Sequence, residues 1–247
     1  MESIGILVPL CARNQDYKKI NDIDFFNYFL VGFYKTISNK HNYRFYIGID
    51  ENDDFLIKNI DNIRKRLNIK DKIIIVPKEL NKNPYQIWNL LTEEAVIDKE
   101  NNYFYQVGSD IKHHTNNWDD YFINILKKNK NIGIIGGVDK HFWLERVDRG
   151  LNGILENVFF HKIHYEIFNY FIKPSIYQWY FDDMLSECYR LCNSCFICPN
   201  FLYQNKNRVG GTNKNNRYKP NMEAKDLWEN IAIEENKKII EYLKIKK

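Results

Sequence analysis

Acidic side chains at two predicted strand ends have the types and spacing of a site for a cation and a nucleotide. Asp110 follows the apolar run 103–107, and the cluster Asp50–Asp54 follows the apolar run 43–49. Hard divalent cations prefer oxygen ligands, so one carboxylate could bind a cation on a diphosphate while another holds a ribose or a base. In an open α/β sheet, ligands bind just beyond the carboxyl ends of the strands. The sequence therefore predicts that Asp50 and Asp110 face one crevice.

A further pair of acids, Asp182-Asp183, follows the aromatic run Trp179-Tyr180-Phe181 at the start of a predicted helix. Aromatic rings can stack on the apolar face of a sugar, and a carboxylate can remove the proton of a hydroxyl group. Acids at a helix N terminus are also favoured by the helix dipole alone, without any catalytic role. The pair is thus a candidate for acid–base chemistry and also a candidate for simple helix stabilisation.

These side chains must be positioned by alternating strands and helices. Strand and helix alternate four times before residue 138, which favours a parallel, doubly wound sheet. The predicted strands are 4–10, 43–49, 72–76, 103–107 and 131–136, and the predicted helices are 24–36, 54–67, 83–95 and 118–128. Beyond residue 140 the pattern changes to a short apolar run at 158–160, helices at 164–171, 178–191 and 223–243, and a polar, mobile loop at 204–221.

Composition excludes several other classes of protein. The net charge of +4 is spread along the chain without a basic stripe, so we expect no nucleic-acid partner. No window reaches the roughly 20 apolar residues that a membrane-spanning helix needs. The start Met1-Glu2-Ser3 is acidic and does not resemble a signal peptide. Five cysteines, an odd number, do not form a secreted disulfide framework. We therefore expect a cytoplasmic protein.

In their order along the chain, these features resemble the nucleotide-sugar-dependent glycosyltransferases of the glycosyltransferase-A fold, particularly the inverting type. The resemblance covers about residues 4–190. It implies an α/β fold with a Rossmann-like, doubly wound and mostly parallel sheet flanked by helices, in a single domain over 1–247. Within it we expect a nucleotide-binding half at about 1–138, an acceptor-side half with a mobile loop at about 139–222, and a C-terminal helix at 223–247.

The resemblance also assigns roles to particular residues. In the family, the first strand ends in a Pro-containing loop beside the nucleotide, and the second strand ends in an acid that holds the nucleoside. A helix carries an Asn ahead of the metal strand, which ends in Asp-x-Asp. Here that last motif is Gly108-Ser109-Asp110, which leaves Asp110 as the expected ligand of Mn²⁺ or Mg²⁺. The nucleotide-binding residues implied are Pro9, Arg13, Asp50, Asn89, Ser109 and, from the late basic loop, Arg217.

On the acceptor side, the family has an acid pair at the start of a late helix, which matches Asp182-Asp183. Neighbouring helix residues point about 100° apart, so both carboxylates cannot contact one hydroxyl. We assign the catalytic base to Asp183 and the binding of an acceptor or donor hydroxyl to Asp182. The expected partners are a nucleotide-sugar donor and a glycan or other hydroxyl acceptor.

Other interpretations stay open. A degenerate, non-catalytic domain that binds a glycan or a protein partner is compatible with Gly108. A sugar nucleotidyltransferase would need a glycine-rich loop after the first strand, and 10–17 contains no glycine. A redox or cluster-binding protein would use the four cysteines, Cys188, Cys192, Cys195 and Cys198. Four histidines are expected to be solvated or structural, although the first two could add a metal ligand: His113, His114, His161 and His164. Arg208, Lys214 and Arg217 form either a phosphate clamp or a solvated basic loop.

Overall fold

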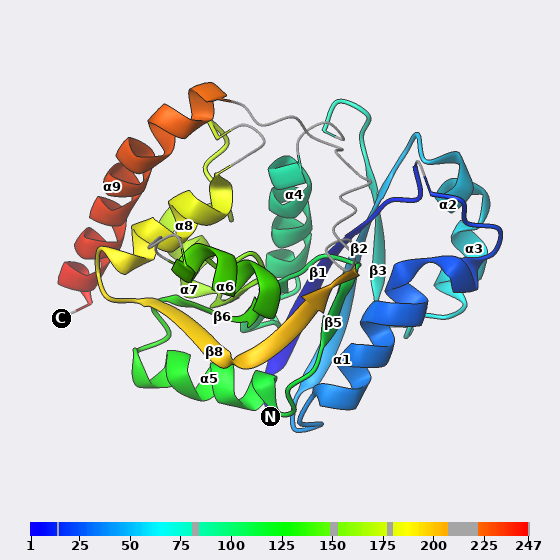
Figure 1. Cartoon of the computed structure of the whole chain (residues 1–247), viewed down its shortest axis with the longest axis horizontal. Coiled ribbons are helices and arrows are strands. Elements are labelled where there is room, and N and C mark those ends of the chain that lie inside the picture. The colour runs from blue at the N-terminus through cyan, green and yellow to red at the C-terminus, as the bar shows by residue number, and fades with distance from the viewer. Residues whose placement is uncertain (14, 81–83, 149–152, 177–179, 207–221, 247) are drawn as a thin grey trace.

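The computed structural model describes residues 1–13, 15–80, 84–148, 153–176, 180–206 and 222–246. Its centre is one eight-stranded sheet with the strand order β3-β2-β1-β4-β7-β6-β8-β5 (Figure 1). The predicted single α/β domain with a Rossmann-like sheet is confirmed. The finer division into a nucleotide half, an acceptor half and a C-terminal helix stays a prediction.

One half of the sheet is parallel. It contains β1 (Ser3–Leu10), β2 (Asn42–Asp50), β3 (Lys72–Val76) and β4 (Tyr103–Gln106). Apolar residues fill β1 without a break because helices cover both of its faces. Leu10 pairs with Ile49, and Asp50 pairs with Val76, so the carboxyl ends of β1, β2 and β3 lie along one edge. The sequence predicted all four of these strands.

The other half of the sheet is mixed. It contains β7 (Val158–His161), β6 (Ile134–Asp139), β8 (Cys195–Asn205) and β5 (Ile111–His113). β7 runs antiparallel to both of its neighbours, β4 and β6, while β6 and β8 are parallel and β5 is antiparallel to β8. Across the described chain, four of the seven strand pairings are parallel, which agrees with a mostly parallel sheet.

Side chains alternate between the two faces of the sheet along each strand, so apolar strands place apolar side chains on both faces. Helices cover both of these faces. Ile4, Ile6 and Val8 of β1 face one apolar core, and Leu7 faces the other. The first core is covered by η2 (Phe25–Phe29), α1 (Leu30–Thr36), α2 (Asp54–Lys58), α3 (Ile60–Arg64) and α5 (Trp118–Lys128). The second is covered by α4 (Pro84–Ile97), α7 (Ile163–Phe168), α8 (Phe181–Arg190) and α9 (Met222–Ile245). In Figure 1, α8 and α9 lie on the side of the molecule opposite α1, α2 and α3.

Several predicted elements differ in detail. The helix expected at 54–67 is two short helices that meet at Asn59, whose side-chain amide donates to the Phe55 carbonyl (2.8 Å). The helix expected at 164–171 ends at Phe168 because Asn169 adopts a left-handed conformation (φ 61°). Of the loop expected at 204–221, the first two residues belong to β8, which continues to Asn205, and residues 207–221 lie outside the described residues.

Three elements were not predicted at all: the 3-10 turn η1 (Ile20–Asp22), β5, and α6 (Lys140–Asp148). None of the helices in the described residues combines the length and the apolar character that a bilayer crossing requires.

Candidate active site

The end of β2 brings together two residues of the predicted nucleotide site. Asp50 is the last residue of β2 and is buried, and its Oδ2 lies 2.5 Å from an Nη of Arg13. The same guanidinium donates to the Asn52 side chain at 2.6 Å. Asp53 fixes the loop that carries Arg13, because its carboxylate accepts the Ala12 N–H (2.6 Å) and caps α2. The β1 loop and the acidic β2 loop are therefore one hydrogen-bonded unit.

Pro9 lies slightly away from its expected place. It pairs with Gly48 inside β1 and is half-buried, and the loop begins only at Cys11. A proline has no N–H to donate, so it fits at this position only because the hydrogen bonds between β1 and β2 do not require a donor there.

The turn after β4 carries the predicted cation ligand. Asp110 is half-buried, and its main-chain carbonyl accepts the N–H of Lys206 (2.9 Å), just beyond the end of β8. Ser109 is also half-buried, in the same turn. The N–H of Gly108 donates to the side chain of Asn157 at 3.2 Å. A Cβ atom on Gly108 would lie 2.7 Å from Oδ1 of Asp110, so glycine allows this carboxylate to fold back over the turn.

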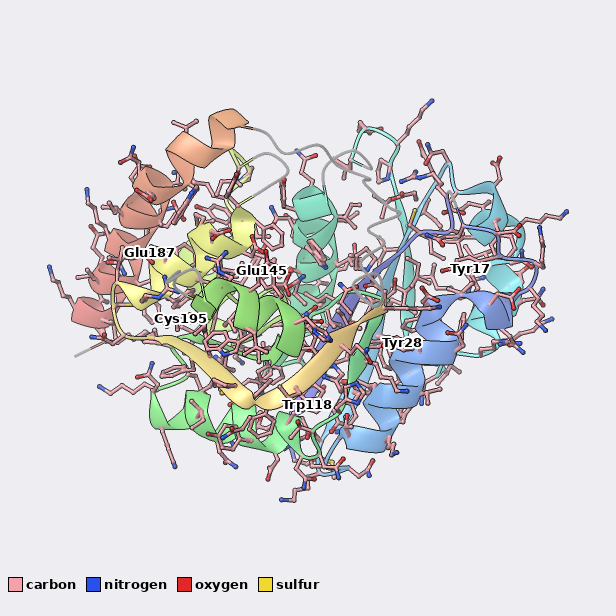
Figure 2. All side chains as sticks on the ribbon, viewed as in Figure 1. Tyr17, Tyr28, Trp118, Glu145, Glu187 and Cys195 are labelled. Carbon is pink, nitrogen blue, oxygen red and sulfur yellow. The ribbon has the colours of Figure 1, made fainter. Side chains whose placement is uncertain are left out.

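Negative charge converges around Tyr28. Burial raises the pKa of the Tyr28 hydroxyl, and the carboxylates of Asp110, Asp139 and Asp24 raise it further. Lys206 and Lys112 place their ammonium groups 5.9 and 5.4 Å from the Tyr28 ring centre. Figure 2 shows Tyr28 beside the end of β8. This edge of the sheet is thus acidic and partly enclosed.

Sequence reasoning missed Asp139. It is the last residue of β6 and is buried; its Oδ1 accepts the N–H groups of His141 and Phe142, and its Oδ2 accepts that of Asn205 (2.8 Å). The predicted strand stopped at Gly136, three residues too early. An acid directly after a glycine-containing apolar run was the signal that could have found it.

The acid pair lies in the first turn of α8, which begins at Phe181; the residue before the helix, Tyr180, adopts a left-handed conformation (φ 71°). Asp183 forms an ion pair with Arg146 of α6 (3.2 Å), and Asp182 accepts the N–H of Asp183 (3.1 Å). Burial raises the pKa of the Asp182 carboxyl to about 7, and the charges of Asp183 and Glu156 contribute to the same shift. A carboxyl with this pKa can take up a proton near neutral pH.

One short loop connects the turn after β4 with the acid pair. Residues 153–157 lead into β7, and within them Asn157 accepts the Gly108 N–H while the N–H of Leu155 donates to Ser186 of α8 (3.0 Å). Between these two contacts, Glu156 accepts the Tyr203 hydroxyl proton (3.0 Å). The loop therefore sets the spacing between the predicted cation ligand and the predicted base.

The aromatic residues before the acid pair are only partly available for a sugar. The ring of Phe181 packs against Tyr85 and Trp88 of α4, with centroid distances of 5.3 and 5.5 Å, so it belongs to the core. Trp179 lies outside the described residues, as do Arg208, Lys214 and Arg217 of the late loop.

Asn89 has a structural partner. Its side-chain carbonyl accepts the N–H groups of Phe171 and Ile172 (3.0 and 2.8 Å), and its amide donates to the Ile172 carbonyl (2.8 Å). These bonds join α4 to the segment after α7. A role of Asn89 at the nucleotide stays a prediction.

The first two histidines differ from each other. His113 was expected to be solvated, but it lies in β5, where it stacks on Trp118 (4.9 Å), and burial lowers its pKa to about 3. His114 is exposed. His164 is a core residue that binds the Tyr189 hydroxyl (2.7 Å) and the Phe171 carbonyl (2.9 Å). Within the described ranges, no group of three or more His, Cys, Asp and Glu side chains could hold a metal ion.

The four clustered cysteines lie where helix α8 passes into β8. Burial raises the pKa of the Cys195 thiol to about 12 and that of Cys198 to about 11, and it raises the pKa of Cys188 still further. Metal ligation requires thiolates, whereas these environments favour neutral thiols. The cysteines therefore have the environment of packing residues.

No protein-family model matches the chain, and no curated protein matches its sequence. Among solved structures, the mannosyltransferase PcManGT from Pyrobaculum calidifontis, in complex with GDP-Man and Mn²⁺, superposes with a TM-score of 0.56 at 10% identity, over 94% of this chain and 73% of that one.

S. aureus TarS superposes with a TM-score of 0.51 at 12% identity, over 82% of this chain and 36% of TarS. S. aureus TarS 1–349 superposes with a TM-score of 0.50 at 12% identity, over 82% of this chain and 59% of that one. The chain thus corresponds to little more than a third of TarS. These likenesses establish the class of fold: this is an α/β domain of the kind found in a mannosyltransferase.

Proposed function

We propose that the protein is a glycosyltransferase of the glycosyltransferase-A type, which moves a sugar with inversion from a nucleotide diphosphate donor to a hydroxyl group of a glycan or other acceptor. One observation carries the proposal: loop 153–157 ties the turn of Asp110 to helix α8, whose first turn carries Asp182-Asp183. This connection supports a donor site and a proton acceptor near each other at the strand-end edge where α/β sheets bind ligands. The likeness to a mannosyltransferase complex with GDP-Man supports it.

The donor nucleotide would bind across the ends of β1, β2 and β4. We assign the nucleoside to Asp50, with Arg13 beside it, because a buried carboxylate at a strand end can accept hydrogen bonds from a ribose or a base. Ser109 lies in the turn that would face the diphosphate. The proposed contacts from Pro9 and Asn89 are carried over from the resemblance alone. Arg217 is proposed as a phosphate contact from the basic character of the late loop, and it lies outside the described residues.

A divalent cation, Mn²⁺ or Mg²⁺, would bind at this edge of the sheet only together with the donor phosphates. Asp110 offers one carboxylate there, and Mg²⁺ is commonly held by one or two carboxylates together with substrate phosphates and water. Asp110 would be the main protein ligand, since Gly108 removes the first acid of Asp-x-Asp. When bound, the cation would neutralise the charge of the leaving diphosphate.

The base is better assigned to Asp182 than to Asp183. Asp183 already pairs with Arg146, whereas the pKa of about 7 for Asp182 suits proton uptake at neutral pH. As the acceptor oxygen forms its bond to the sugar, the bond from the sugar to the diphosphate breaks and the diphosphate leaves with the electron pair. The acceptor proton passes to the Asp182 carboxylate. Asp183 and Arg146 would hold this end of α8 in place.

A degenerate domain that binds a glycan or a partner without catalysis is the alternative that Gly108 favours. A thermal-shift screen against nucleoside diphosphates and nucleotide sugars, with and without Mn²⁺, tests the proposal. A ligand at 100 times its dissociation constant should add about 2.7 kcal/mol of stability. Stabilisation by a nucleotide sugar, followed by transfer to an acceptor, would support the enzyme. Stabilisation by free glycans alone would favour the alternative, and no response to any nucleotide would contradict the proposal.

A further inference from the structure

A second cavity lies far from the acidic edge. It has a volume of about 340 Å³, within the usual range for small-molecule sites. Its walls come from the loop before β6, the junction of β7 and α7, and the last turns of α9. β7 begins at the loop that binds Gly108 and ends at His161 in this cavity, so the two sites occupy opposite ends of one strand. In Figure 1, α9 ends on the side of the molecule where the chain starts.

The cavity combines an apolar floor with a cationic rim. Ile132, Ile163 and Leu243 provide the apolar surface, and Lys130, Lys162 and Lys246 provide three ammonium groups. None of these lysines forms an ion pair with another described residue.

The acid in the lining, Glu166, accepts a hydrogen bond from the Tyr242 hydroxyl at 2.9 Å. Three ammonium groups and one carboxylate leave the lining with a net charge of +2. This charge matches the two negative charges of a phosphate monoester.

His161 supplies a neutral donor within the cavity. Its side chain is buried (8% exposed), and its Nδ1 accepts the N–H of Ile163 (3.2 Å), so the ring proton of the neutral form resides on Nε2. The ring is fixed edge-on against Tyr103, with a centroid distance of 4.9 Å. Burial, reinforced by Lys162, lowers the pKa of His161 to about 4, so the ring is neutral at pH 7. Among the described residues, no acceptor binds the Nε2 proton.

We infer that this cavity, formed by His161, Lys162, Lys246 and the apolar floor, is a second ligand site for an organic phosphate, that is, a phosphate monoester on a small apolar body. The phosphate would lie between the ammonium groups and the Nε2–H of His161, and the apolar body would contact Ile132 and Leu243. Charge-assisted bonds of this kind are the strong ones in proteins. The site is separate from the proposed transferase site and does not depend on it.

Calorimetry with hexyl phosphate tests the inference, with inorganic phosphate and hexanol as partial ligands. Hexyl phosphate should bind at a 1:1 ratio and more tightly than either partial ligand. His161→Phe keeps the ring against Tyr103 but removes the donor, and it should weaken binding about tenfold. Lys246→Ala should weaken it several-fold. Lys128→Ala, at an exposed lysine of α5 outside the cavity, is the matched control and should leave binding unchanged.

Two results would show that surface charge alone explains the binding, and either would overturn the inference. One is an equal loss of hexyl phosphate affinity in Lys128→Ala and Lys246→Ala. The other is an affinity for inorganic phosphate equal to that for hexyl phosphate. If His161→Phe fails to fold, Leu243→Trp, which fills the cavity, should abolish binding while the melting temperature is kept. The last experiment measures whether the protein sediments together with vesicles that contain phosphatidic acid. If the protein sediments with the vesicles only when Lys246 is present, and does not bind hexyl phosphate, its ligand is a membrane surface, which would also overturn the inference.

Discussion

The carboxyl of Asp182 allows one substitution, Asp182→Asn, to test both stability and catalysis. Its pKa is raised from 3.8 to about 7, so the folded protein holds this proton more tightly than the unfolded chain does. A raised folded-state pKa stabilises the fold fully below the unfolded pKa, and this stability is lost as pH rises through the folded pKa. Asn keeps the shape of Asp and can still accept the N–H of Asp183, but it does not ionise.

The size of the stability difference follows from the pH interval over which the Asp182 carboxyl of the parent protein loses its proton. Two pH units separate pH 5 from the folded pKa, which corresponds to about 3 kcal/mol. Because the side chain is only half-buried, we halve this value to about 1 to 2 kcal/mol. Asp182→Asn should therefore gain about 1 to 2 kcal/mol over the parent between pH 5 and pH 8, or about 2 to 8 °C in melting temperature for a chain of this size.

Calorimetric melting of both proteins at pH 5 and pH 8 measures this difference. Asp183→Asn is the comparison variant: it removes the ion pair with Arg146 and should lower stability by about 1 kcal/mol at pH 5, and by less at pH 8, because the charge of Asp183 no longer repels the ionised Asp182 carboxylate. A gap between parent and Asp182→Asn that is the same at both pH values would refute the reasoning about burial.

Catalysis gives the second measurement. Loss of a general base typically lowers the rate about 10²- to 10⁴-fold. Asp182→Asn should lose turnover in that range and keep its donor affinity. The rate of the parent should rise with pH up to about 7 and then level off, because the carboxylate must be ionised. If Asp183→Asn loses far more activity than Asp182→Asn, the base is Asp183, as the sequence indicated.

Three further outcomes are expected at the donor side. Asp50→Asn should weaken nucleoside diphosphate binding about tenfold by calorimetry, because the buried carboxylate loses its charge; unchanged affinity would remove Asp50 from the site. Asp110→Asn should abolish the Mn²⁺-dependent part of diphosphate binding and leave the metal-free part similar, and a parent protein that never responds to Mn²⁺ would contradict a cation site. Gly108→Asp restores Asp-x-Asp, but its Cβ would lie 2.7 Å from Oδ1 of Asp110, so we expect weaker Mn²⁺ binding in a titration; tighter binding would show that the turn adapts.

The sequence by itself determined the order of the four parallel strands and the helices between them, and the acids Asp50 and Asp110 that follow two of these strands. Predominantly apolar runs such as 4–10 and 103–107 indicate burial on both faces, which is a local property, so β1 and β4 could be placed without a structure. Asp50 and Asp110 followed from these strands, because polar residues directly after a buried strand lie at the sheet edge. The acid pair at the start of α8 followed from helix periodicity in the same way.

Only the tertiary structure decided which strands pair and which acids meet. A short apolar run such as 158–160 carries no information about its neighbours, and the antiparallel placement of β7 between β4 and β6 depends on pairings far apart in sequence. That placement sets loop 153–157 against Gly108 and α8. It brings Glu156 near Asp182, and the pKa of that carboxyl depends on its burial and on this charge. The cavity at His161 also depends on how α9 packs against β7 and α7, which no local pattern encodes.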